Sequence, residues 1–259
     1  MKSQFNISEL PINELAAIGI YRENQLLLEP EAISSLLSGR RTTLISLHEL
    51  KGQGFSIERL DARLSLHRAN SGAVELLIHP IYKHPRAHPL LNEQEMSALI
   101  SGDRAFIAKA VEREEGRSTM YNIEYDKITR DFMGYDVSKV QAPERVNGML
   151  LSEEEKSAFQ RGELIQLTDG TKLQHRASEP KGMISDRKAL VLSVLLDGGI
   201  SYLLLQGIRA LGEDSPQIDH RTPAFNAALS EMEGDKPASK REISAGEIQA
   251  PPVARGLGR

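Results

Sequence analysis

The chain of 259 residues contains no cysteine. This absence excludes disulfide bonds, thiol nucleophiles and cysteine-ligated zinc or iron–sulfur sites, and it is compatible with a reducing compartment. The N-terminal sequence MKSQFNISELPINEL lacks the apolar segment of a secretory signal. The longest apolar stretches, near 190–196 and 200–205, are shorter than the ~20 residues that a membrane span requires. We therefore expect a soluble, cytoplasmic protein that does not associate with membranes.

Strong positive charge is also missing from every part of the sequence. Residues 1–89 carry 10 Lys and Arg against 9 Asp and Glu, residues 90–211 carry 16 against 19, and residues 212–259 carry 6 against 8. The net charges are therefore +1, −3 and −2, which sum to the −4 of the whole chain. Proteins that hold duplex DNA mainly through its phosphates usually have a basic domain or stripe. The charge distribution argues against such binding, although folding can still gather arginines on one face.

A segment of similar sequence occurs three times, and each copy predicts a short helix that ends at a glycine. The copies read LEPEAISSLLSGRR (28–41), LNEQEMSALISGDR (91–104) and LSEEEKSAFQRGEL (151–164). Gly39, Gly102 and Gly162 recur at intervals of 63 and 60 residues, which is typical of a repeated structural unit. Glycine is favoured there because the residue after a helix often has left-handed backbone geometry. Ser152 and Glu155 have the spacing of a capping box at the start of the third helix.

After each glycine the apolar residues alternate with polar ones, which predicts strands. The expected strands are 43–47, 62–66 and 74–79 in the first module, 104–111, 121–125 and 128–133 in the second, and 163–168 and 190–196 in the third. Turns are expected at 70–72, at Asp126 and at Asp186. The predicted fold class is α+β, with three repeated helix-plus-antiparallel-meander (αβββ-like) modules.

Four regions follow from this pattern. Residues 1–89 hold an extra N-terminal helix near 12–18 and module one, residues 90–148 hold module two, and residues 149–211 hold module three with a terminal helix at 200–211. Residues 212–259 are rich in proline and poor in large apolar side chains. They are predicted to form a mostly disordered tail, because they bury too little apolar surface to offset the entropy of ordering.

The order of several segments is similar to that of a known pair of families. These segments are ISELPINELAAIGI, LLSGRRTTLISL, ARLSLHR, VELLIHPIYK, the LNEQEM helix with its SGDR turn, YNIEYDKITRDF and NGMLLSEEEKSAFQRGELIQL. Over residues 5–205 the chain resembles the tandem domain-of-unknown-function families 4099 (N-terminal) and 3945 (central) of Bacteroidetes mobile and conjugative element proteins. The resemblance implies a cytoplasmic accessory protein of a mobile element, and it carries no catalytic residue onto this chain. The third module departs from the family pattern after Gly170.

Three His-Pro pairs, at His79, His84 and His88, are the sharpest local candidate for a metal site. Neutral imidazole is a common ligand of zinc, copper and nickel. However, proline favours an extended connector between the first two modules, and extended spacing holds the three rings apart. We therefore favour a linker over a metal site.

Charged residues beside the helix ends and turns are the remaining candidates. Arg40, Arg41 and Arg104 follow helix-ending glycines and are candidate contacts for an anion or a nucleic acid. Arginine at the negative end of a helix is also favourable for purely local reasons. Asp126 and Asp186 occupy equivalent places and could act as an acid–base pair, but aspartate is also a preferred turn residue.

These observations favour a non-catalytic binding or adaptor protein that has another protein as its partner and needs no cofactor. No phosphate-binding loop or nucleophile-elbow motif is present in the sequence. The first alternative is a nucleic-acid-associated factor in DNA transfer or element maintenance. A weaker alternative is a hydrolase or nuclease of unfamiliar type. The oligomeric state is left open.

Overall fold

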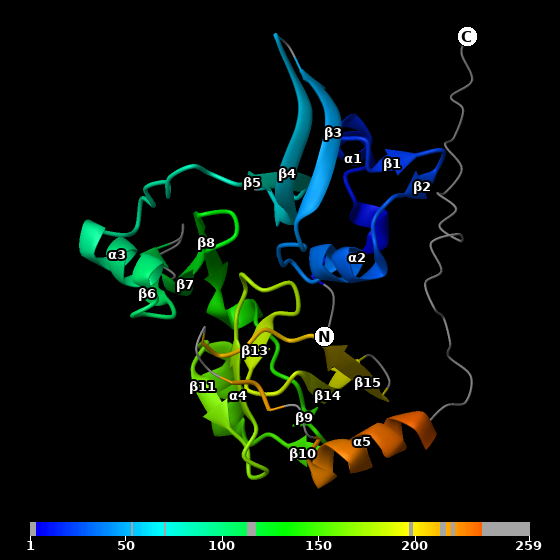
Figure 1. Ribbon diagram of the computed structural model, residues 1–259, viewed down its shortest axis with the longest axis vertical. Helices are drawn as coiled ribbons and strands as arrows, with labels where there is room; N and C mark the ends of the chain where they lie inside the picture. The colour runs from blue at the N-terminus through cyan, green and yellow to red at the C-terminus, as the bar shows by residue number, and fades with distance from the viewer. Residues whose placement is uncertain are drawn as a thin grey trace.

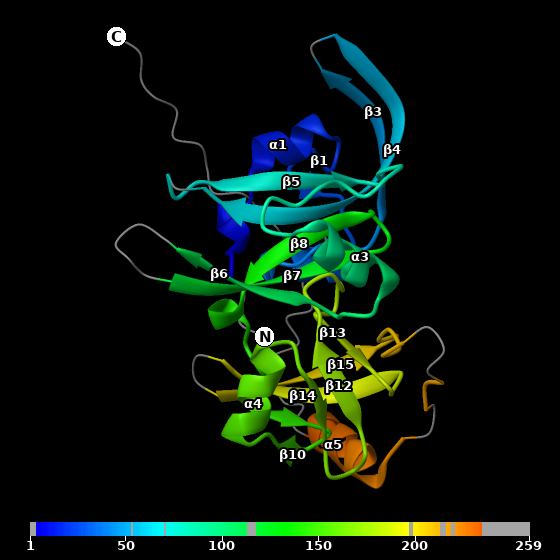
Figure 2. The same cartoon turned by 90° about the vertical axis from the view of Figure 1, so that its left-hand side faces the viewer.

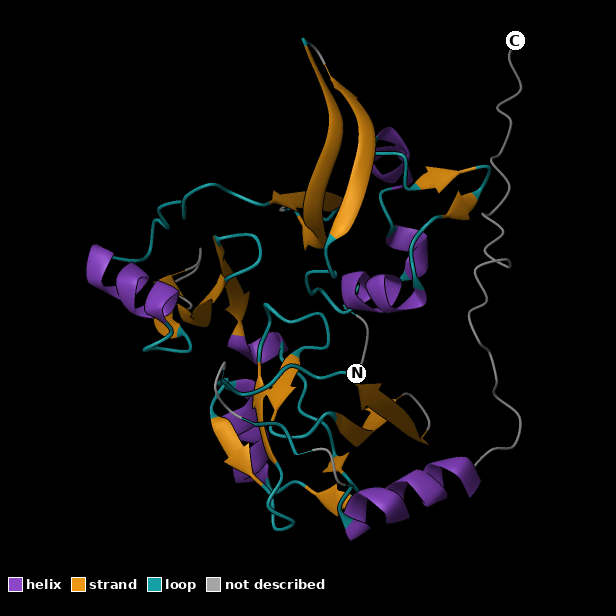
Figure 3. Cartoon of the chain, in the orientation of Figure 1, coloured by secondary structure: helices purple, strands orange, loops and turns teal. Residues whose placement is uncertain are grey.

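The computed structural model of the chain describes residues 4–52, 54–69, 71–112, 118–196, 199–212, 216–218 and 221–234. Helices and small antiparallel sheets follow one another along the chain, as expected for an α+β protein (Figure 1). Figure 3 shows that helices are interspersed among the sheets and do not form a layer of their own. In the described part of the chain, no helix has the length and apolarity needed to cross a membrane.

The N-terminal part surrounds a core of its own. Its elements are η1 (Ile7–Glu9), α1 (Ile12–Ala17), β1 (Tyr21–Arg22), β2 (Gln25–Leu26), α2 (Pro30–Leu37), β3 (Ile45–Gly52), β4 (Phe55–Arg68) and β5 (Val74–Pro80). Strands β3, β4 and β5 form one sheet in sequential order. Leu15, Leu36 and Leu64 are at most 1% exposed and belong to one apolar cluster that joins α1 and α2 to this sheet. The hairpin of β3 and β4 extends well beyond the rest of the sheet (Figure 1).

The middle part has a smaller core. It consists of α3 (Glu93–Ser101), β6 (Ile107–Glu112), β7 (Ser118–Asp126), β8 (Asp131–Asp136) and η3 (Val137–Lys139). Strands β6, β7 and β8 again pair in sequential order. Leu99 of α3 packs with Ile123 of β7 and Phe132 of β8. This cluster is small because much of the other surface of β7 is polar and faces neighbouring parts of the chain.

The C-terminal part contains two sheets. Its elements are β9 (Arg145–Val146), β10 (Met149–Leu150), α4 (Glu153–Gln160), β11 (Leu164–Gln166), β12 (Lys172–His175), β13 (Met183–Ser185), β14 (Ala189–Leu196), β15 (Gly199–Gln206) and α5 (Pro223–Gly234). Strands β11, β12 and β13 form one sheet, and the other has the order β10-β9-β14-β15. Phe159 of α4 and Leu173 of β12 share a core with Leu190 of β14.

Helices α2, α3 and α4, which were predicted from the three similar segments, end at the expected glycines. The φ angles of Gly39, Gly102 and Gly162 are +70°, +86° and +74°. At Gly39 the positive φ is what favours glycine, because the atom nearest to an added Cβ, Oε1 of Gln4 at 2.6 Å, is the end of a flexible side chain that can move away. Ser152 forms the predicted capping box, in which its Oγ accepts a hydrogen bond from the Glu155 backbone N–H at 3.1 Å.

The C-terminal strands differ from the prediction. Residues 190–196 were expected to return to the third module's sheet, but β13 does so and β14 joins β9 and β15 instead. The expected terminal helix at 200–211 is wrong, because residues 199–206 form β15 and pair with β14 along its whole length. A short apolar run is compatible with a buried strand or a buried helix, and only its distant partner decides between them.

The predicted tail also contains ordered structure. Helix α5 occupies residues 223–234, and Phe225 and Ala228 pack on Val191 of β14. The prediction of disorder is wrong for this segment because it underestimated the apolar face that these few side chains form. Residues 235–259 lie outside the described residues, so the prediction for them stays untested.

Candidate functional site: a buried polar junction

Charged side chains are buried where the three parts of the chain meet. Arg63 of β4 and Asp126 at the end of β7 are each 2% exposed, and Arg41, just before β3, is 3% exposed. Oδ2 of Asp126 accepts hydrogen bonds from Nη1 of Arg63 at 2.8 Å and from Nη1 of Arg41 at 3.1 Å. Two arginines of the N-terminal part therefore converge on one carboxylate of the middle part.

The local turn holds Asp126 in place for this contact. Its other carboxylate oxygen, Oδ1, accepts a hydrogen bond from the Ile128 backbone N–H at 3.0 Å. Ile128 and Thr129 thus belong to the turn, and β8 begins at Asp131, three residues later than the sequence predicted. Burial raises the pKa of Asp126, but Arg63 and Arg41 outweigh it and hold the pKa below its usual value.

Asp131 extends the cluster toward the surface. Its Oδ2 accepts a hydrogen bond from Nη2 of Arg41 at 3.0 Å and lies 3.8 Å from Nδ1 of His79. Nε2 of His79 shares a 2.8 Å hydrogen bond with the Ser65 hydroxyl. Burial lowers the pKa of His79 despite the nearby Asp131 carboxylate. The His79 ring is therefore held by a hydrogen bond at Nε2 and has a carboxylate neighbour on its Nδ1 side.

A loop of the C-terminal part, residues 176–182, inserts into this junction. We call it the junction loop. The Ser178 carbonyl accepts a hydrogen bond from Nη1 of Arg63 at 2.7 Å. The Pro180 carbonyl accepts hydrogen bonds from Nε of Arg40 at 2.8 Å and from the Ser35 hydroxyl at 3.1 Å. Burial lowers the pKa of Arg40 to about 10.

Glu124 of β7 holds the same loop from the other side. Its side chain is fully buried, and its carboxylate accepts hydrogen bonds from the backbone N–H groups of Ala177 at 3.3 Å and Ser178 at 3.0 Å. Burial raises the pKa of Glu124, although the charge of Arg176 and these two amides oppose the shift. The junction loop is thus bound by the N-terminal and the middle part of the chain at once.

His175 lies at the foot of the junction loop. Its ring packs against Tyr135 and Phe159, with ring centroids 5.2 Å and 5.4 Å away. Burial, reinforced by the charge of Arg40, lowers the pKa of His175 to about 3. Within the described part of the chain its Nδ1 has no hydrogen-bond partner. The ring is therefore neutral near pH 7 and acts as an aromatic packing group.

The two buried carboxylates of the junction have protein partners. Asp126 is held by two guanidinium groups and Glu124 by two backbone amides. Removal of one partner of such a buried pair leaves an uncompensated charge, which is strongly destabilising. The junction therefore fixes how the three parts of the chain are joined.

The structure places the predicted anion-binding arginines in two different environments. Arg40 and Arg41 are buried and donate to protein acceptors in the junction, so their guanidinium groups do not present a surface to an anion. Arg104 is exposed.

Asp126 is a turn residue as predicted, but Asp186 is not its equivalent. Asp186 follows β13 and continues its pairing, because its Oδ1 accepts a hydrogen bond from the Lys172 backbone N–H at 2.8 Å.

The three His-Pro histidines do not come together. His79 lies in the junction, His84 is exposed, and His88 packs edge-on against Phe132 with a centroid separation of 6.2 Å. Among the described residues no group of three or more histidine or carboxylate side chains is arranged to hold a metal ion.

Sequence reasoning missed Arg63, Glu124 and the junction loop. Arg63 alternates with Ala62 and Leu64 in β4, and this pattern is the same whether the side chain faces water or another part of the chain. The available signal was the sequence RASEPKG, which interrupts the third module with a proline and a glycine. An interruption of this kind indicates a loop, but it does not say what the loop contacts.

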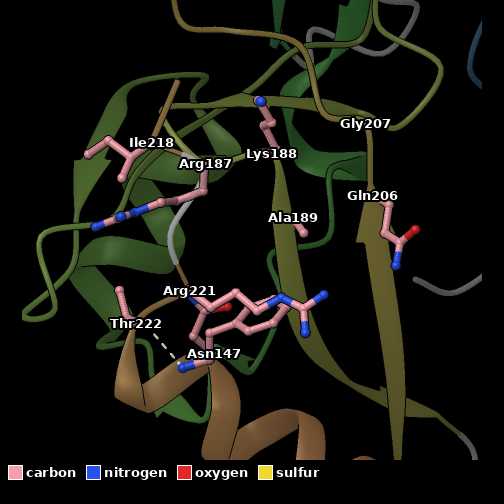
Figure 4. Close-up of a pocket in the computed structure, with 10 residues that line it drawn as sticks. Asn147, Arg187, Lys188, Ala189, Gln206, Gly207, Ile218, Arg221 and Thr222 are labelled. Carbon is pink, nitrogen blue, oxygen red and sulfur yellow. Dashed lines mark hydrogen bonds between the residues drawn. The ribbon is translucent and has the colours of Figure 1, made fainter. Parts of the chain in front are cut away.

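A separate cavity of about 240 Å³ lies between β14, β15 and the start of α5. Arg187, Lys188 and Arg221 line it with Thr222 and Phe225. Figure 4 shows that the three basic side chains extend in different directions and do not converge on one point. Thr222 caps α5, since its hydroxyl accepts a hydrogen bond from the Phe225 backbone N–H at 3.0 Å. The cavity thus has basic walls without a focused binding group.

Comparison with known families assigns the N-terminal part of the chain. Residues 5–89 match the family described as Protein of unknown function (DUF4099). This match confirms the N-terminal half of the family resemblance, and it ends in the connector between β5 and α3. The central family 3945 is not shown by this comparison. Neither the curated proteins nor the solved structures include a match to the chain.

Proposed function

We propose that this protein is a non-catalytic adaptor that holds several small sheets in a fixed arrangement and presents their surfaces to another protein. The observation that best supports this proposal is the junction, where Arg63 donates hydrogen bonds to the Asp126 carboxylate and to the Ser178 carbonyl. One side chain thereby ties the N-terminal part to both other parts. A scaffold of this kind needs a rigid arrangement, and the buried ion pairs and amide contacts supply it.

The same proposal includes an internal repeat. Helices α2, α3 and α4 are each followed by a three-stranded antiparallel sheet in sequential order. We propose that these units descend from one helix-plus-meander module. Each unit also contributes groups to the junction, and these contacts join the three units into one assembly.

Strand β15 supports a protein partner. It is at the edge of its sheet in the described structure, and its sequence GISYLLLQ contains no charge and no proline. Edge strands are commonly protected from pairing by charges, prolines or bulges. An unprotected apolar edge favours addition of a strand from another chain.

We also propose that the protein belongs to a mobile genetic element. The family resemblance implies an accessory protein of a conjugative or other mobile element that works in the cytoplasm. The DUF4099 match supports the lineage of residues 5–89 but carries no activity.

Affinity purification of the tagged full chain from its host, with and without nuclease, tests the adaptor role. A stoichiometric protein partner that survives nuclease is expected. Leu203→Lys places a charge on the exposed side of β15 and should reduce the amount of this partner that is recovered. Leu164→Lys is the matched control, because Leu164 is 54% exposed on another edge strand, β11. Loss of every partner on nuclease treatment would contradict the proposal.

A nucleic-acid-associated factor is the second candidate. The observation that favours it is a group of exposed cations on the connector after β5 and on the turn between β7 and β8. Cations grouped in this way attract the phosphates of a nucleic acid.

A further inference from the structure

The connector between β5 and α3 is fixed against the turn between β7 and β8. The Thr129 carbonyl accepts a hydrogen bond from the Tyr82 backbone N–H at 3.0 Å. Nη1 of Arg130 donates a hydrogen bond to the Lys83 carbonyl at 2.9 Å. Figure 2 shows the connector passing beside β8 on one face of the molecule. Two segments more than forty residues apart in sequence therefore form one surface.

This surface is basic. Residues 76–92 contain Lys83 and Arg86 but no aspartate or glutamate. The adjoining turn adds Lys127 and Arg130. The Lys127 side chain lies beside Gly102 at the end of α3, because its Nζ would be 3.8 Å from a Cβ added to that glycine. We call the four exposed cations Lys83, Arg86, Lys127 and Arg130 the connector patch.

Lys83, Arg86 and Arg130 differ in their pairing from several other cations of the protein. Arg68, Lys109 and Lys156 each form an ion pair with a carboxylate, at 2.6–2.8 Å. In the described structure Lys83, Arg86 and Arg130 form no ion pair with any carboxylate. After Tyr82, the Asp131 carboxylate contributes to the raised pKa of Arg86, and it is already bound by Arg41 at 3.0 Å. The positive charges of Lys83, Arg86 and Arg130 are therefore not neutralised by a bound carboxylate.

The two arginines of the patch are also held in place, Arg130 by the Lys83 carbonyl and Arg86 by Tyr82. The guanidinium carbon of Arg86 lies 5.1 Å from the centroid of the Tyr82 ring, and its Nη1 donates a hydrogen bond to the Tyr82 hydroxyl at 3.0 Å. Prolines at 80, 85 and 89 stiffen the connector that carries Lys83 and Arg86. Guanidinium and ammonium groups carried on a stiff segment are suited to contact the phosphates of a nucleic-acid backbone.

We propose that the connector patch binds the phosphate backbone of a nucleic acid without reading its sequence. Phosphate contacts of Lys and Arg release condensed counterions, so the binding depends steeply on salt. The inference goes beyond the adaptor role and does not depend on it, because it concerns a different face from β15. A protein partner of β15 and a nucleic acid on the patch would make the scaffold a link between the two.

The test is fluorescence anisotropy of the purified full chain with labelled single-stranded and double-stranded oligonucleotides of mixed sequence, over a salt titration. The wild-type chain is expected to bind at low salt, with little difference between sequences. Comparison of the single-stranded and double-stranded arms shows which form the patch prefers. Lys83→Glu/Arg86→Glu should weaken binding by at least about tenfold and lower the slope of log affinity against log salt by about 2.

The control is Lys51→Glu/Lys139→Glu, which makes the same charge change at two exposed lysines outside the patch. This control should leave the slope of log affinity against log salt near the wild-type value. A neutral pair, Lys83→Gln/Arg86→Gln, should fall between the wild type and the reversed pair, and thermal melting checks that every variant is folded. Equal losses in patch and control variants would overturn the proposal, as would binding to poly-glutamate but to neither oligonucleotide. This outcome is independent of the protein partner, because only purified protein is used.

Discussion

Arg63 and Asp126 lie 63 residues apart in the sequence, and their side chains form a 2.8 Å ion pair in which each is 2% exposed. The pair lies between two sheets, not inside one. Arg63 also donates to the Thr42 carbonyl at 2.8 Å and to the Ser178 carbonyl at 2.7 Å, so its guanidinium group meets acceptors from all three parts of the chain. Loss of this group would therefore affect the whole assembly.

Asp126→Ala is expected to destabilise the protein by about 3–5 kcal/mol, because it leaves Arg41 and Arg63 buried without their shared carboxylate. Urea unfolding followed by circular dichroism measures this loss. Asp61→Ala is the matched control, since the Arg59–Asp61 pair lies at the surface and should contribute little. Similar unfolding midpoints for the two variants would mean that the junction does not stabilise the fold.

Gly182→Ala tests the fit of the junction loop. Gly182 has a φ of +72°, and an added Cβ would lie 3.0 Å from Cδ of Arg40. Gly170→Ala is the control, because Gly170 has a φ of +81° but no atom within 4 Å of the added Cβ. Both variants carry the backbone cost of about 1 kcal/mol, and only Gly182→Ala displaces Arg40. Thermal unfolding should show a lower midpoint for Gly182→Ala, and equal midpoints would mean that the loop yields freely.

His175 is expected to make stability depend on pH. Its pKa is lowered from 6.5 to about 3 in the folded protein, so the unfolded chain binds the additional proton between these values. The free energy of unfolding is therefore highest, as far as His175 is concerned, above pH 6.5. It decreases as the pH falls from 6.5 toward 3, by at most ~1.4 kcal/mol per pH unit.

The measurement for this prediction is urea unfolding at several pH values between 7 and 4. His175→Phe keeps an aromatic ring beside Tyr135 and Phe159 and should flatten the pH dependence. Some dependence should remain, because burial also lowers the pKa of His79. His84→Gln, at an exposed histidine, should leave the wild-type slope unchanged. An unchanged slope in His175→Phe would assign the pH dependence to other groups.

Phe225→Ala tests the role of α5. Phe225 is 3% exposed and packs on Val191, so its truncation should cost about 3–5 kcal/mol if the helix belongs to the folded unit. Asn226→Ala changes the neighbouring exposed residue and should leave stability nearly unchanged. Chemical denaturation of both variants gives the comparison. A negligible effect of Phe225→Ala would show that α5 packs only loosely on β14.

Much of the local structure was predictable because it depends on neighbours in the sequence. The capping box of Ser152 and Glu155 involves residues three apart, and Gly162 ends the same helix with a φ of +74°. The turn at Asp126 was predictable for the same reason, since its Oδ1 bonds the backbone two residues later. The site residues were harder, because Arg41 could be read as a helix-end arginine with a free guanidinium group.

The sequence by itself determined the helix ends, the turns and the alternation of the strands in the first two modules, since each rests on hydrogen bonds and steric preferences within a few residues. Only the tertiary structure decided that Arg63 faces a second sheet instead of water, that β14 leaves the third module to pair with β15, and that the junction loop lies against Glu124. These outcomes depend on which distant surface covers each face, and the local periodicity is the same whether that face meets water or protein.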